Sequence, residues 1–115
     1  MIFKAGQGLF GKIKFVDGTS PAYDRAYLIV SVSQNCISTL NVSSLAGKEH
    51  KLLYSTNKEI KNHCPPFIKR TFVKLDSLTY ISVNEATSMR LMSNGQVLDT
   101  NELEAIISMI APPPK

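Results

Sequence analysis

The chain has 115 residues, of which 43% are hydrophobic and 19% are charged. This length fits one domain, 1–115, that buries its own core, and the composition excludes a disordered chain and a coiled coil. The net charge of +4 is compatible with a nucleic-acid partner. No run approaches the roughly 18 consecutive apolar residues of a membrane span. The N-terminus carries no secretory signal, so we expect a cytoplasmic protein.

The first part of the chain divides into short strands joined by turns. Alternating apolar residues predict a strand over 8–15, and the Asp-Gly and Ser-Pro pairs that follow predict a long turn over 16–24. The apolar run within 25–32 predicts a buried strand. The short polar segment 33–35 predicts a hairpin that leads into a returning strand over 36–44.

The middle of the chain is less regular. A short strand is predicted over 51–54, and two adjacent prolines predict irregular structure over 57–67. The segment 70–83 indicates one or two strands interrupted at an Asp-Ser pair, and an Asn-Gly pair predicts a turn within 87–98. Short strands separated by turns favour a mainly β fold, either a small barrel or a sandwich of antiparallel strands.

The C-terminal segment predicts one amphipathic helix. Asp99, with Glu102 three residues later, fits a capping box at its start. Apolar residues then recur at helical spacing and form a face that packs on the barrel or contributes to a homodimer interface: Leu103, Ile106, Ile107, Met109 and Ile110. The proline-rich end stops this helix, and we expect 112–115 to be a flexible tail.

Several motifs then occur in an order that is similar to a known family. They are "KIKFVDG", "RAYLIV" followed by "LNVSS", "PPFIKRTFVKLDSL" and the terminal helix. From about residue 4 to residue 110 the chain resembles the PemK/MazF toxin endoribonucleases of type II toxin–antitoxin modules. The resemblance implies an SH3-like barrel, a homodimer, and cleavage of single-stranded RNA, including mRNA, to a 2′,3′-cyclic phosphate. It also implies a cognate antitoxin that occludes the RNA site, and no metal or cofactor.

The resemblance implies catalytic roles for Arg25 and Ser43. The arginine before the family's hydrophobic second strand matches Arg25, although Ala26 stands where the family usually has proline. The hydroxyl residue that ends the third strand, usually threonine, matches Ser43, with Ser44 beside it as a candidate assisting group. Asp24 is a candidate to orient the guanidinium, and its alternative role is that of a turn residue.

Some members also carry an arginine and an aspartate that assist catalysis or base recognition further along the chain. The approximate positions here hold Thr79 and Ser82, which lack those functions. The sequence therefore indicates either a nuclease that relies on fewer charged groups or a diverged, inactive relative.

The chemistry requires an attack of the 2′-hydroxyl on the adjacent phosphorus. It needs a base, an acid, and donors directed at the non-bridging oxygens. Arg25 suits charge stabilisation, because a guanidinium stays protonated and holds phosphate oxygens with two parallel bonds. Ser43 supplies a hydrogen bond, but neither group is a good base. His50 and His63 have ordinary pKa values near neutrality, and His50 is the better-placed candidate. The alternative for both is an exposed loop histidine.

Basic and aromatic residues provide candidates for RNA binding. Tyr23 lies in the loop before the second strand and can stack on a base, whereas Tyr27 lies in the apolar run and is expected in the core. Phe67 is a further stacking candidate. The candidates for phosphate contacts, which otherwise form an ordinary solvated face, are Lys12, Lys14, Lys48, Lys51, Lys69 and Arg70.

Other readings of the chain remain open. A non-catalytic SH3-like module that binds protein or nucleic acid would keep the barrel without the chemistry. A gyrase poison on the same barrel is disfavoured, because that activity is associated with a Trp-containing C-terminal motif and the chain has no tryptophan. Two cysteines and two histidines lack the spacing of a zinc site. Cys36 is expected in the core and Cys64 in a loop.

Overall fold

The computed structural model describes residues 2–14 and 17–110, in which seven strands form one antiparallel sheet. The strands are β1 (Gly8–Gly11), β2 (Arg25–Val32), β3 (Cys36–Ser44), β4 (Asn57–Ile60), β5 (Thr71–Lys74), β6 (Thr79–Ser82) and β7 (Arg90–Leu91). The helical elements of the described residues are η1 (Glu49–Leu53), α1 (Val83–Thr87), η2 (Met92–Gly95) and α2 (Thr100–Met109). None of these helices is long and apolar enough to cross a bilayer. The tail expected at 112–115 lies outside the described residues.

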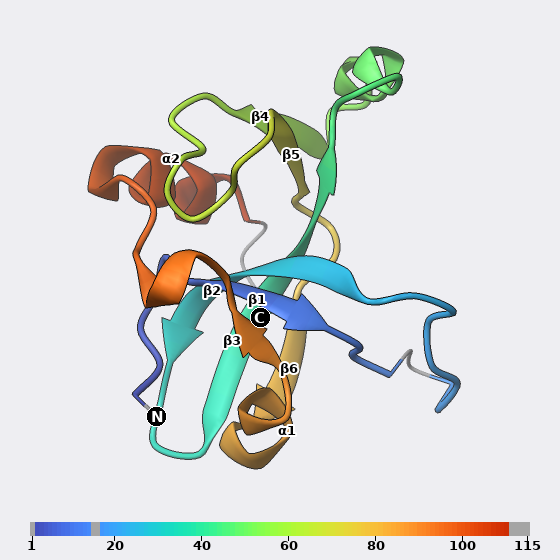
Figure 1. The fold of residues 1–115 in the computed structure, drawn as a ribbon. Coiled ribbons are helices and arrows are strands. Elements are labelled where there is room, and N and C mark those ends of the chain that lie inside the picture. Colours follow the sequence, from blue (N-terminus) through green and yellow to red (C-terminus); the bar gives the residue numbers. More distant parts are fainter. Residues whose placement is uncertain (1, 15–16, 111–115) are drawn as a thin grey trace, which may run out of the picture.

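The predicted mainly β fold with a C-terminal helix is confirmed (Figure 1). The sheet has the order β4-β5-β3-β2-β1-β7, and β6 also pairs with β3. Among the described strands no ladder joins β4 to β7, so the curved sheet is an open barrel. The strands predicted over 25–32 and 36–44 are present and form a hairpin, closed by the Ser33 amide donating to the Cys36 carbonyl at 2.8 Å. Cys36, expected in the core, is only partly buried.

Two hydrophobic cores lie against opposite faces of the sheet. In β2, Leu28 and Val30 belong to one core, whereas Tyr27 and Ile29 belong to the other. Such alternation is expected of a strand that is covered on both faces. Tyr27 is 5% exposed, which confirms its predicted core position. The central hairpin is therefore a rigid support for the side chains at its ends.

Some predicted elements are wrong. The strand expected over 51–54 is replaced by η1, which buries no residue and leaves Leu53 87% exposed. In Figure 1, η1 (green) projects from the rest of the fold. The nearby strand is instead β4, at the start of the segment expected to be irregular. A short apolar run cannot by itself distinguish strand from helix, and β4 is specified by its pairing with β5 instead. The first strand also ends at Gly11, earlier than predicted.

The segment 70–83 does form two strands, β5 and β6, which pair with successive parts of β3. Between them the chain leaves the sheet at 75–78, next to Asn41 of β3. The backbone amide of Asn41 donates to Ser77 Oγ at 2.8 Å, and Ser77 Oγ donates to the Lys74 carbonyl at 2.6 Å. These two hydrogen bonds stand where β3 pairs with neither β5 nor β6, and they hold the segment 75–78 against β3.

The C-terminal helix begins as predicted, with the Asp99 carboxylate accepting a bond from the Glu102 amide at 3.1 Å. The Glu102 side chain does not complete the capping box. Its Oε1 instead accepts from the Lys61 amide at 2.8 Å and lies 3.7 Å from Lys58 Nζ, which ties α2 to the end of β4. Ile106 is fully buried in one of the cores, whereas Ile107 is 41% exposed.

Candidate functional site

The central hairpin brings Arg25 and Ser43 to one cavity. In the antiparallel pair of β2 and β3, Ala26 lies opposite Val42. Arg25 precedes Ala26 and Ser43 follows Val42, so the two residues lie at the same end of the hairpin's strands. They line a cavity of about 440 Å³, which we call the Arg25 cavity. The other lining residues are Phe10, Tyr23, Asp24, Ala26, Val42, Ser44, Phe67, Ile68, Lys69, Thr71 and Met92.

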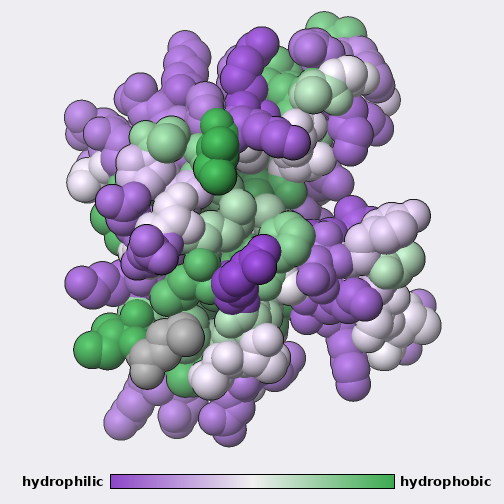
Figure 2. All heavy atoms as spheres, viewed as in Figure 1, coloured by the Kyte–Doolittle hydropathy of each residue, from purple (hydrophilic) through white to green (hydrophobic). Residues whose placement is uncertain are grey.

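The lining of the Arg25 cavity is mostly apolar. Two of its lining side chains pack closely against Gly8, where an added Cβ would lie 3.1 Å from Phe67 Cε1 and 3.2 Å from Met92 Sδ. At the rim, Tyr23 is 72% and Ile68 79% exposed. Figure 2 shows that apolar side chains are open to solvent among hydrophilic ones on the face in view. A concave apolar site with a few polar groups is the usual form of a ligand site.

Arg25, which lines this cavity, carries a buried donor without a partner in the described part of the chain. Its Nε is buried and has no hydrogen-bond partner among the described residues. A buried N–H without an acceptor is costly, and native structures normally supply a protein group, water or ligand to satisfy it.

A second cavity, of about 350 Å³, lies next to Ser43 and carries a cluster of ammonium groups. We call it the lysine cavity. Lys48 Nζ donates to Ser43 Oγ at 3.4 Å, a long hydrogen bond that places one cation beside the hydroxyl. The lining residues are Ser43, Lys48, Lys51, Tyr54, Thr56, Asn57, Phe72, Lys74 and Asp76. Ser43 thus lies between an apolar cavity and a cationic one.

Lys74 has an unusual electrostatic environment in the lysine cavity. Burial lowers its pKa, and the positive charges of Arg25, Lys48 and Lys51 lower it further, while Asp76 opposes them. Desolvation and like charges both disfavour the protonated amine. A lysine in this setting loses its proton more easily than an exposed one, which is a property of lysines that act as bases.

Sequence reasoning missed Lys74 and Asp76. Thr79 and Ser82, which match the approximate positions of the family's assisting charged residues, have structural roles. Thr79 Oγ1 donates to the Ser77 carbonyl at 3.0 Å, and Ser82 caps α1. A signal was present, because Lys74 interrupts the apolar run "FVKL" at the end of a strand. The sequence alone does not indicate that Lys74 lies near Ser43, because this proximity follows from the pairing of β5 with β3.

Several other candidates do not reach the Arg25 cavity. His50 is exposed in η1 and lines neither this cavity nor the lysine cavity. Lys12 lines a separate shallow cavity with Asp24 and Arg90. Arg70 donates from Nε and one terminal nitrogen to Glu59 Oε2, at 3.1 and 3.0 Å.

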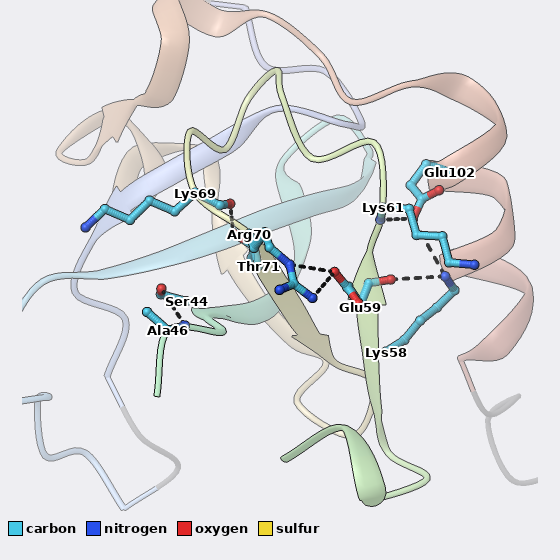
Figure 3. Close-up of polar contacts among 9 residues, drawn as sticks. All are labelled: Ser44, Ala46, Lys58, Glu59, Lys61, Lys69, Arg70, Thr71 and Glu102. Carbon is cyan, nitrogen blue, oxygen red and sulfur yellow. Dashed lines mark hydrogen bonds and ion pairs between the residues drawn. The ribbon is translucent and has the colours of Figure 1, made fainter. Parts of the chain in front are cut away.

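Figure 3 shows the different directions taken by two adjacent basic residues. The Arg70 side chain points toward Glu59, while the Lys69 side chain extends away from that ion pair. Lys69 lines the Arg25 cavity. Ser44 also lines it, and its Oγ accepts a bond from the Ala46 amide at 3.3 Å, which stabilises the turn after β3. Lys14 lines a third cavity, of about 350 Å³, together with Asn41 and Asp76.

Comparisons with known proteins add no assignment. No family model matches the chain, and no curated protein sequence matches it significantly. Within the described residues there is no group of three or more His, Cys, Asp or Glu side chains that could hold a metal ion.

Proposed function

We propose that this protein is a metal-independent endoribonuclease that cleaves single-stranded RNA, of the type found in PemK/MazF toxins. One observation carries the proposal. Arg25 and Ser43, which the sequence motifs single out independently of any structure, line the same cavity. The cationic cluster beside Ser43 adds the positive charge that a phosphodiester requires.

In this proposal the scissile phosphate lies at Ser43, between the two cavities. The guanidinium of Arg25 and the ammonium of Lys48 stabilise the charge that develops on the non-bridging oxygens. The Ser43 hydroxyl donates a further hydrogen bond. The 2′-oxygen forms a bond to phosphorus while the bond from phosphorus to the 5′-oxygen breaks, which leaves a 2′,3′-cyclic phosphate and a free 5′-hydroxyl.

Lys74 provides the base that the sequence motifs leave unassigned. In its neutral form it accepts the proton of the 2′-hydroxyl, and its lowered pKa makes this form accessible. Lys48, whose Nζ lies beside Ser43 Oγ, supplies the proton for the leaving 5′-oxygen. No residue outside the two cavities is needed for proton transfer.

The same proposal includes the biological setting of a toxin. We expect a homodimer in the cytoplasm whose RNA site is blocked by a cognate antitoxin. A binding module without catalysis is the second candidate, and the mostly apolar Arg25 cavity favours it, because such a surface also suits a protein ligand.

The test is cleavage of a labelled single-stranded RNA in excess EDTA. We expect a 2′,3′-cyclic phosphate product from the wild type and a rate loss of about 100-fold or more for Arg25→Ala and for Ser43→Ala. The matched control for the hydroxyl, Ser33→Ala at the hairpin turn, lies outside both cavities and should cleave normally. No cleavage by the wild type, or full activity of both cavity variants, would overturn the proposal and leave the binding module.

A further inference from the structure

The three lysines of the lysine cavity differ in the partners of their ammonium groups. Lys48 Nζ donates to Ser43 Oγ at 3.4 Å, and Lys51 Nζ lies over the Tyr54 ring, 5.7 Å from its centroid. Lys74 is only partly exposed, and its Nζ forms no ion pair with a carboxylate of the described residues. The Lys74 amine is thus available for chemistry inside the cavity.

Strand pairing directs the Lys74 side chain into the lysine cavity. Lys74 ends β5, where it lies opposite Asn57 of β4, and both residues line the cavity. Phe72, two positions earlier, lies opposite Ser43 of β3, and these two residues line it as well. Residues two positions apart on a strand share one face of the sheet. The amine is therefore carried by a paired strand, and the cavity of about 350 Å³ leaves room beside it for a small molecule.

The surroundings of Lys74 favour the neutral amine over the ammonium form. Burial lowers the pKa of Lys74 most, and the charges of Arg25, Lys48 and Lys51 lower it further, against the effect of Asp76. A lysine that is desolvated beside other cations is activated as a nucleophile, because its nitrogen lone pair is free. The same cations would stabilise a negative charge placed on Nζ. A reaction that converts this amine into an anion is therefore doubly favoured.

We propose that Lys74 Nζ forms a reversible carbamate with dissolved CO₂, and that the ammonium groups of Lys48 and Lys51 hold the resulting anion. The nitrogen lone pair forms a bond to the carbon of CO₂, one carbon–oxygen π pair moves onto oxygen, and a proton leaves the nitrogen for water. The step requires no oxidant, reductant or leaving group. The carbamate oxygens accept charge-assisted hydrogen bonds from the two lysines. An acyl donor would instead leave a neutral amide, which gains nothing from the cations.

The carbamate makes the lysine cavity sensitive to both CO₂ and pH. At a constant concentration of dissolved CO₂, its amount should rise with pH, because only the neutral amine reacts. One consequence rests on the proposed function. The modified nitrogen of Lys74 can no longer accept the proton of the 2′-hydroxyl, and the new negative charge repels the phosphodiester. Dissolved CO₂ should then inhibit cleavage reversibly.

The first experiment measures the carbamate directly on the wild-type chain and needs no RNA. The protein is incubated with ¹³C-labelled bicarbonate in a closed vessel, the carbamates are trapped as esters with triethyloxonium, and peptides are analysed by mass spectrometry. We expect the trapped fraction at Lys74 to be several times that at Lys69, which is exposed and lies outside the lysine cavity. The α-amino group of the chain, whose ordinary pKa is near neutrality, is the positive control for trapping. Equal fractions at Lys74 and Lys69 would overturn the inference.

A second experiment tests the cations that hold the anion. Lys51→Gln should lower the trapped fraction at Lys74 several-fold, whereas the matched control Lys61→Gln, exposed and outside the cavity, should not. Far-ultraviolet circular dichroism verifies that both variants are folded. An unchanged fraction in Lys51→Gln would contradict the proposal.

The third measurement separates the modification from the nuclease. RNA cleavage by the wild type is followed with and without CO₂ at constant pH and ionic strength, and we expect a lower rate with CO₂. A carbamate trapped at Lys74 of a protein that cleaves no RNA would support the modification site and overturn only the proposed nuclease function.

Discussion

Two adjacent isoleucines in α2 test how the helix is attached to the sheet. Ile106 is fully buried, while Ile107 is 41% exposed. Truncating a buried isoleucine to alanine costs about 2–5 kcal/mol, through lost burial and the cavity that remains. The total stability of a domain is about 5–15 kcal/mol, so Ile106→Ala should remove a large part of it. Ile107→Ala should cost less than about 1 kcal/mol.

The assay is urea unfolding followed by far-ultraviolet circular dichroism, because the chain has no tryptophan. The gain in helix propensity from isoleucine to alanine is the same at both positions and cancels in the comparison. An unchanged dependence on urea concentration would show that both variants unfold from the same compact state. Equal losses for the two variants would refute the reasoning, because Ile107 would then be buried in solution. If that loss also depended on protein concentration, a second copy of the chain would be covering Ile107.

Four further predictions concern charge and capping. The cleavage rate of the wild type should rise with pH at values below 10.5, because the pKa of Lys74 is lowered. In Lys74→Arg this rise should disappear, because arginine does not titrate in this range. The free energy of unfolding of the wild type should also increase with pH in this window, because the unfolded chain binds the Lys74 proton more tightly. In Lys69→Ala the slope of the logarithm of the RNA-binding constant against the logarithm of salt concentration should become shallower by about 0.7. Arg70→Ala should change this slope less, because the guanidinium of Arg70 is paired with Glu59 in the wild type. Asp99→Ala should lower the free energy of unfolding by about 1 kcal/mol in the urea assay, because α2 loses its cap.

The proposed site depends on the central hairpin more than on any loop. Both strands are packed on their two faces by buried side chains, so the positions of Arg25 and Ser43 relative to each other vary little. Groups held on strands are placed more accurately than groups on loops. The lysines that line the lysine cavity come from β5 and from the segment after β3.

Local patterns in the sequence were sufficient for the elements that carry a strong signal. The apolar run of β2, the polar tip of the hairpin, and the spacing of Leu103 and Ile106 in α2 are local properties, and each predicted its element correctly. The motifs also singled out Arg25 and Ser43. Where the signal was weak, as at η1 and β4, the prediction failed, because pairing with β5 rather than local pattern determines the structure there.

Only the tertiary structure decided which polar groups share a site. Lys74 and Asp76 stand far from Ser43 in the sequence, and nothing local marks either as its neighbour. The pairing of β5 with the end of β3 brings them together, and burial beside three other cations then lowers the pKa of Lys74. Where the pairing of β3 is interrupted, Asn41 and Asp76 line a further cavity. A sequence specifies which chemical groups a chain carries, whereas the distances and the solvent exposure that set their reactivity arise only when the strands pair.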